Sequence, residues 1–229
     1  MHEEISSFGF KPKLLLHVCC APCSSACIEK LKDYFDITFL YYNPNIYPES
    51  EYVRRKGEFE RLGVKVVDLG YNHNEFLQVT KGMEEEKEGG NRCRVCIAMR
   101  LKRAFIYAVE NNFDIVTTTL SISPHKDAEF INLLGERLEK EYGIKYLHAD
   151  FKKENGYLRS IEICKELGIY RQEYCGCEWG QQTRCNRPSW NGGLLFWVVA
   201  LTYMRGHPAG ISPHYSPSNR LLVLRNSPK

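Results

Sequence analysis

An apolar run that ends in clustered cysteines constrains this chain more than any other stretch. Residues 14–18 read Leu-Leu-Leu-His-Val, and Cys19, Cys20 and Cys23 follow directly. The run shows little alternation and leads into turn and N-cap residues, which is typical of a buried parallel strand followed by a helix. In open α/β sheets ligands bind at the carboxyl ends of strands, where a helix N-terminus lowers the pKa of a thiol. We therefore expect three candidate metal ligands at a ligand-binding edge.

The number and spacing of the cysteines favour metal or redox chemistry. The chain has 229 residues and ten cysteines, in an otherwise ordinary composition of 43% hydrophobic and 26% charged residues. It shows no signal-peptide pattern, so we expect a cytoplasmic protein, and structural disulfides are rare in that compartment. The longest apolar run, 194–203, is shorter than the roughly 20 residues of a membrane helix, so we expect no membrane span. The net charge of +3 neither shows nor excludes a nucleic-acid partner.

The order of elements predicts an open parallel α/β sheet with helices on both faces. After the first strand we expect a helix from Ser24 to Tyr34, with Ser24 or Ser25 as its N-cap. Apolar and β-branched runs predict strands over residues 37–42, 64–69, 114–120 and 145–149. Amphipathic patterns predict helices over 48–62, 97–111 and 160–167, one within 72–88 and one ending near 142. Strands that alternate with helices in this way favour right-handed crossovers.

An adjacent cysteine pair and a Cys-x-x-Cys motif together offer four thiolates. Cys93 and Cys96 lie at the start of the helix expected over 97–111, one turn apart on one face. Together with Cys19 and Cys20 they can hold a zinc ion or an iron-sulfur cluster. Adjacent cysteines splay their side chains, which favours a cluster with separate iron corners over one tetrahedral zinc ion. Buried inert thiols and a redox pair at Cys93 and Cys96 are the alternatives.

A second constellation is Cys175-Gly176-Cys177. Two thiols two residues apart can close a small strained disulfide, with Gly176 supplying the backbone freedom. Such a disulfide is easily reduced, so the pair suits a redox shuttle or the ligation of a second metal. A chance pair of loop cysteines is the alternative, and Cys23 suits either site.

A polar loop and a basic group complete the candidate residues. His125, Lys126 and Asp127 follow the strand expected over 114–120, at the same sheet edge as Cys19, where they can donate protons or hold an anionic substrate. Asp127 fits a helix N-cap equally well. Basic residues around the Cys-x-x-Cys motif can contact a phosphate backbone or form ordinary solvated surface. They are Arg92, Arg94, Arg100, Lys102 and Arg103.

Four segments, taken in this order, resemble the QueH type of epoxyqueuosine reductase. They are the strand with Cys19-Cys20-Ala-Pro-Cys23-Ser-Ser, Arg92-Cys93-Arg94-Val-Cys96, residues 117–127 and residues 170–177. The resemblance spans roughly residues 12–180. It implies a nucleotide-binding-like α/β fold related to the PP-loop and HUP proteins, a 4Fe-4S cluster and a neighbouring mononuclear iron. It also implies the last step of queuosine biosynthesis, in the anticodon loop of tRNA.

The resemblance also implies roles for individual cysteines. It assigns the cluster to Cys19, Cys20, Cys93 and Cys96. It makes Cys175 and Cys177 either a redox-active pair, with or without a disulfide bond, or ligands of the second iron, for which Cys23 is a further candidate. An electron donor, which the sequence does not identify, completes the list of partners. We accordingly expect a metal-binding reductase domain over residues 1–182 and a C-terminal extension over 183–229 for which the sequence predicts no fold.

The expected reaction is the reductive deoxygenation of an epoxide, which needs two electrons and two protons and yields an alkene and water. An open iron or the second metal would bind the epoxide oxygen as a Lewis acid, Cys175 and Cys177 would relay reducing equivalents, and Asp127 or His125 would supply a proton. One alternative is a PP-loop-derived tRNA-thiolating enzyme, but cysteines and Pro22 occupy the place of the Gly- and Ser-rich phosphate cradle. A non-enzymatic zinc-binding RNA module is the other.

Overall fold

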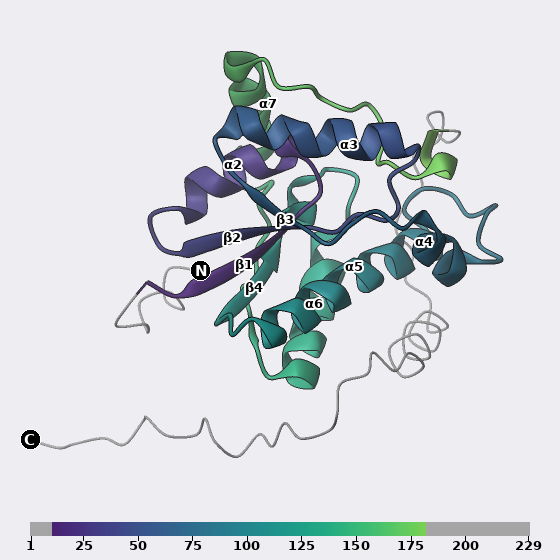
Figure 1. The fold of residues 1–229 in the computed structure, drawn as a ribbon, viewed down its shortest axis with the longest axis horizontal. Helices are drawn as coiled ribbons and strands as arrows, with labels where there is room; N and C mark the ends of the chain where they lie inside the picture. Colours follow the sequence, from purple (N-terminus) through teal and green to yellow (C-terminus); the bar gives the residue numbers. More distant parts are fainter. Residues whose placement is uncertain (1–10, 182–229) are drawn as a thin grey trace, which may run out of the picture.

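Five parallel strands form one open sheet in the computed structural model, which describes residues 11–181 (Figure 1). The strand order is β3-β2-β1-β4-β5. The strands are β1 (Lys13–Val18), β2 (Asp36–Tyr41), β3 (Val66–Asp68), β4 (Ile115–Thr118) and β5 (Lys145–Tyr146). The predicted parallel α/β sheet is confirmed, although β5 is shorter than predicted. Beyond Tyr146 the Leu147 N–H still donates to the Val116 carbonyl, but the Leu147 carbonyl accepts from the Thr117 hydroxyl, both at 2.9 Å.

Helices cover both faces of the sheet, as the sequence predicts (Figure 1). They are α2 (Ala21–Leu31), α3 (Glu49–Gly57), α4 (His73–Thr80), α5 (Asn91–Glu110), α6 (Ala128–Tyr142) and α7 (Gly156–Leu167). There are also three short 3-10 helices among the described residues, η1 (Glu58–Leu62), η2 (Thr119–Ile122) and η3 (Glu178–Gln181). The helices α2, α3 and α7 lie on one face, and α5 and α6 lie on the other.

The central strand β1 is buried on both faces, which explains its lack of alternation. Leu14 and Leu16 pack into the core under α2 and α7, whereas Leu15 packs into the core under α5 and α6. All three side chains are fully buried. Burial of a leucine side chain stabilises a fold by roughly 1.5–3 kcal/mol, so the apolar run anchors the sheet from its centre.

The order of the strands places a topological switch point beside the clustered cysteines. The chain adds β2 and β3 on one side of β1 and then returns to add β4 and β5 on the other side. The carboxyl ends of β1 and β4 are therefore neighbours at the point where the winding reverses, which is where open α/β sheets bind ligands. Cys19 follows β1 there, and its sulfur lies 3.9 Å from the hydroxyl of Thr119, which follows β4.

Helix α2 begins earlier than the sequence predicts. Cys20 is its N-cap, and the Cys20 sulfur accepts a hydrogen bond from the Cys23 backbone N–H at 3.4 Å. The prediction that Ser24 or Ser25 caps the helix is wrong, because both hydroxyls donate back to carbonyls of the first turn, Ser24 to Cys20 and Ser25 to Pro22. Pro22 fits the first turn because its missing N–H would have no partner there.

No helix within residues 11–181 is long and apolar enough to cross a membrane. The predicted extension over residues 183–229 lies outside the described residues.

Candidate functional site

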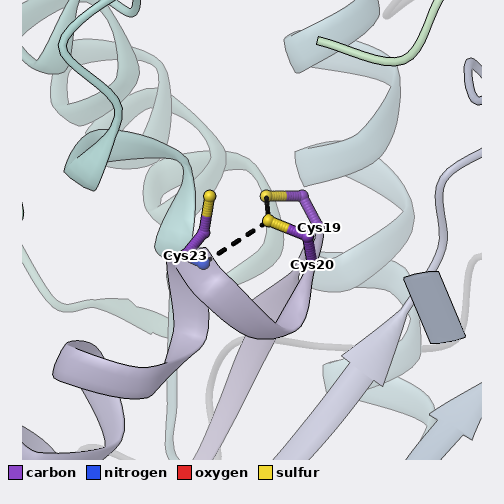
Figure 2. A group of neighbouring side chains, drawn as sticks. All are labelled: Cys19, Cys20 and Cys23. Carbon is purple, nitrogen blue, oxygen red and sulfur yellow. Dashed lines mark hydrogen bonds between the residues drawn. The ribbon is translucent and has the colours of Figure 1, made fainter. Parts of the chain in front are cut away.

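Cys19, Cys20 and Cys23 form a compact group of thiols between the end of β1 and the start of α2 (Figure 2). Their three sulfur atoms all lie within 4.8 Å of one another. The sulfur atoms of Cys19 and Cys20 are 3.7 Å apart. Three soft donors at this separation suit a thiolate-ligated metal ion or part of an iron-sulfur cluster. The structure thus brings Cys23, which the sequence left between two sites, to the adjacent pair.

The Cys-x-x-Cys motif lies in the first turns of α5, as the sequence predicts. Cys93 and Cys96 line a small cavity together with Cys175 and Cys177. The predicted pair Cys175 and Cys177 therefore lies at the same cavity as the motif. All nine cysteines within the described residues are free thiols, Cys175 and Cys177 included.

A larger cavity of about 630 Å³ adjoins the small one. Cys19 and Cys23 line the larger cavity, and Cys175, Arg100 and Lys126 line both. Cys175 therefore stands at the junction between the two groups of thiols. Soft donors gathered around one pair of cavities fit a thiolate-ligated iron or zinc group by their chemistry.

Two cations face these thiols from within the protein. The Lys126 amine lies 3.5 Å from the Cys175 sulfur. Arg100 is buried, hydrogen-bonds Cys96 and donates to the Asn43 side-chain oxygen, while its Nε has no hydrogen-bond partner. Burial opposes the charge on Lys126 and Arg100, but the neighbouring thiolates outweigh it and raise the pKa of both. The cations favour a group of negative charge in the cavities.

The thiols of the first group differ in acidity. Hydrogen bonds from Cys20 and Cys23, with help from Arg100 and Lys126, hold the pKa of Cys19 well below its usual value. Burial raises the pKa of Cys20 to about 12. A negative charge is therefore more favourable on Cys19 than on Cys20, and a bound metal would displace the protons of the thiols that it ligates.

Three of the five basic residues predicted as a phosphate-contacting patch are buried, so that prediction is wrong for Arg92, Arg94 and Arg100. The Arg92 Nη1 donates to the carbonyls of Met83 and Glu84 at 3.1 and 2.7 Å. Arg100 lines the cavities. The reason is that α5 packs between α4, α6 and the sheet, so most of its length faces protein.

His125 and Asp127 lie in different environments. His125 lines both cavities, and so does Lys126 beside it. Asp127 is not among the residues that line either of these two cavities. Its Oδ1 accepts a hydrogen bond from the Phe130 backbone N–H at 3.0 Å, which makes it the N-cap of α6.

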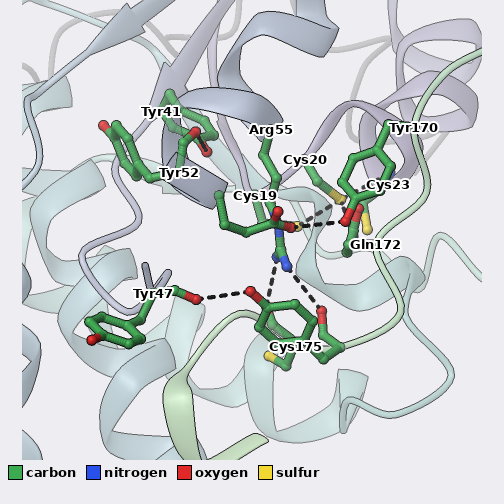
Figure 3. A network of polar contacts seen from close by, with 12 residues as sticks. Cys19, Cys20, Cys23, Tyr41, Tyr47, Tyr52, Arg55, Tyr170, Gln172 and Cys175 are labelled. Atoms are coloured by element: carbon green, nitrogen blue, oxygen red, sulfur yellow. Dashed lines mark hydrogen bonds and ion pairs between the residues drawn. The ribbon is translucent and has the colours of Figure 1, made fainter. Parts of the chain in front are cut away.

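Sequence reasoning missed two residues that touch the cysteines. The Gln172 side-chain amide donates to the Cys20 sulfur at 2.9 Å, and the Arg55 Nη1 donates to the Cys175 carbonyl at 3.0 Å (Figure 3). Gln172 lies inside residues 170–177, one of the four segments that resemble the QueH family, and this was the one sequence feature that could have pointed to it. Arg55 belongs to a charged amphipathic helix, where nothing in the pattern separates a buried arginine from a solvated one.

The comparisons with known proteins agree with this geometry. The model of the family "Epoxyqueuosine reductase QueH" matches residues 14–183. The epoxyqueuosine reductase QueH of Streptococcus pyogenes serotype M1 is 47% identical over 177 residues, which cover 73% of this chain and 69% of the relative. The QueH of Staphylococcus epidermidis is 43% identical, over 74% of this chain and 76% of the relative. The QueH of Thermotoga maritima is 34% identical, over 72% of this chain and 88% of the relative. The chain therefore belongs to the epoxyqueuosine reductase QueH family.

Proposed function

We propose that this chain reduces the epoxide of epoxyqueuosine in tRNA to the alkene of queuosine. Two C–O bonds break, a C=C bond forms, and the oxygen leaves as water with two protons and two electrons from a low-potential one-electron donor. The observation that carries the proposal is the gathering of seven thiols around two adjoining cavities at the sheet's switch point. They are Cys19, Cys20, Cys23, Cys93, Cys96, Cys175 and Cys177. Family membership supports the reaction, and the comparisons support neither a tRNA-thiolating enzyme nor a zinc-binding RNA module.

We further propose that these thiols hold iron. The proposed ligands of a 4Fe-4S cluster are Cys19, Cys20, Cys93 and Cys96. The proposed ligands of a second, mononuclear iron are Cys175 and Cys177, for which a redox-active pair is the other proposed role. Cys23 is the third proposed ligand, because it lines the larger cavity together with Cys175 as well as lying beside Cys19 and Cys20. When bound, these centres would supply single electrons and a Lewis acid. The soft donors, the buried Arg100 and the half-buried Lys126 beside them support this assignment.

The chain's own residues would bind substrate and supply protons. The Lys126 amine and the His125 imidazole face the cavities and are the proposed proton donors to the departing oxygen. Asp127 stays a weaker candidate because its carboxylate accepts the cap hydrogen bond from Phe130.

The larger cavity also suits part of a nucleic acid. Arg171 and Tyr157 line it, with the guanidinium 5.8 Å from the ring centroid. A cation beside an aromatic ring can contact a phosphate and stack on a base. We propose the tRNA anticodon loop as the partner and, because tRNA is modified there, the cytoplasm as the compartment.

The test is queuosine formation by the full chain, reconstituted with iron and sulfide under anaerobic conditions. Nucleoside mass spectrometry would follow the conversion of epoxyqueuosine-containing tRNA in the presence of a low-potential reductant. We expect conversion by the native chain and by Cys27→Ala, a control at a buried thiol of α2 that lines neither cavity. We expect none with Cys19→Ser. An inactive native chain, or a fully active Cys19→Ser variant, would overturn the proposal.

A further inference from the structure

The segment over residues 169–177, here called the cysteine strap, has no helix or strand of its own. Its position therefore depends on contacts with the rest of the fold. The Tyr47 backbone N–H donates to the Gly176 carbonyl at 2.9 Å, and the Tyr174 hydroxyl donates to the Tyr47 carbonyl at 2.8 Å. The Tyr170 backbone N–H donates to the Glu58 carboxylate at 2.8 Å. These bonds fasten the strap to η1 and to the loop after β2.

Arg55 contacts the strap at one of its two cysteines. Its side chain is only 2% exposed. Nη1 donates to the Cys175 carbonyl at 3.0 Å, and Nη2 donates to the Tyr174 carbonyl at 3.3 Å. The planar guanidinium carries its donors in a rigid fork, so two successive carbonyls of the strap are held in one orientation.

Glu51 holds the other side of the guanidinium. It lies one helical turn before Arg55 on α3, and its Oε1 accepts from the Arg55 Nε at 2.7 Å. The same oxygen accepts from the Tyr170 hydroxyl at 3.3 Å, at the beginning of the strap. One buried ion pair on α3 thus contacts the strap at both ends.

The close approach at Gly176 shows how tightly the strap is seated. Gly176 has a φ of +130°, and a Cβ there would lie 3.1 Å from the Arg55 Nη1. The helix itself does not need this contact to pack, because α3 enters the core through Tyr52. The guanidinium is directed at the strap instead.

We infer that Arg55, oriented by Glu51, is a positioning residue that fixes the cysteine strap and thereby places Cys175 at the junction of the two cavities beside Lys126. The consequence for turnover rests on the proposed function, in which Cys175 takes part. The placement itself is a property of the chain and is measurable without activity.

Hydrogen exchange at the Tyr47 amide reports the seating of the strap directly, because that N–H is bonded to the Gly176 carbonyl. The experiment uses the reconstituted full chain and compares Arg55→Met, Arg55→Lys and Glu51→Gln. Lys56→Met is the matched control, since it breaks the neighbouring ion pair of α3 with Asp68. Exchange of the α3 amides is followed in the same samples.

We expect Tyr47 exchange to accelerate about tenfold or more in Arg55→Met, less in Arg55→Lys and Glu51→Gln, and not in Lys56→Met. The loss of turnover should fall mainly on kcat, with KM for tRNA within about twofold of the native value. If Arg55→Met does not fold, the other two variants decide. Native exchange at Tyr47 in every folded variant, or equal acceleration across α3, would overturn the inference. An inactive native chain would overturn the proposed function and leave the exchange result standing.

Discussion

Replacing Asp127 by Asn and by Ala separates helix capping from proton donation. The Asp127 carboxylate accepts from the Phe130 backbone N–H at 3.0 Å, at the start of α6. Asn caps a helix about as well as Asp, whereas Ala leaves the N–H without that partner. Neither amide nor methyl can donate a catalytic proton as a carboxylic acid does. Both variants therefore lack the catalytic proton, but only the Ala variant also lacks the cap.

The stability change follows from what α6 buries. Loss of an N-cap costs about 1 kcal/mol, within a range of about 0.5–2 kcal/mol. Loss of a negative charge near the helix N-terminus adds roughly 0.3–1 kcal/mol. Because Phe130, Ile131 and Leu134 anchor α6 in the core, fraying at the cap loosens buried contacts and is measured in global unfolding. We expect Asp127→Ala to lose about 1–2 kcal/mol and Asp127→Asn less than about 1 kcal/mol.

Urea unfolding and the tRNA assay together check both parts. For a chain of this size the melting temperature falls by about 2–4 °C for each kcal/mol of lost stability, so a thermal scan also distinguishes the Ala variant from the native chain. We expect Asp127→Asn to keep near-native turnover. A stable but inactive Asn variant would show that Asp127 carries a catalytic proton, and an Ala variant of native stability would refute the capping argument.

Three further predictions address the strap, the metal ligands and pH. Gly176→Ala should introduce about 1–3 kcal/mol of backbone strain and slow turnover while the fold survives; a fully active variant would contradict this. Cys23→Ser should lower the iron content per chain in elemental analysis, whereas Cys164→Ser, at a buried thiol of α7, should not, and equal contents would count against Cys23 as a ligand. Burial alone would raise the pKa of Asp68, but hydrogen bonds, first that of Lys56, outweigh it and lower the pKa. The stability that Asp68 contributes is therefore present at neutral pH and lost as the pH falls below about 4; Asp68→Asn should remove that part of the acid sensitivity in urea titrations, and an unchanged pH dependence would refute the assignment.

The sheet was predictable because its strands have simple patterns. Leu14, Leu15 and Leu16 are apolar in succession since β1 is buried on both faces. The edge strand β5 was predicted too long because Lys145 to Ala149 looks extended, while only its first two residues pair with β4. A sequence pattern predicts extended backbone well, but it predicts poorly where strand pairing ends, since pairing depends on the neighbouring strand.

The site was predictable where the chemistry lies in the side-chain type. The cysteine clusters could be found by spacing, and the placement of Cys19 at the carboxyl end of a strand followed from the fold class, whereas the central position of that strand did not. The cap by Cys20 was missed because serine and threonine are usual N-cap residues, whose side-chain oxygen accepts the hydrogen bond, and two serines lie nearby. The role of Arg55 was invisible because its partners, the carbonyls of Tyr174 and Cys175, lie about 120 residues away in sequence.

The product formed in a single turnover tests the central claim most directly. The nucleoside from epoxyqueuosine-containing tRNA, incubated anaerobically with stoichiometric reconstituted chain and a low-potential reductant, would be identified by mass spectrometry. We predict the loss of one oxygen atom from the modified nucleoside, with two electrons consumed for each product formed. A nucleoside that has gained water by opening of the epoxide, or an unchanged epoxide in the presence of fully loaded protein, would contradict the account.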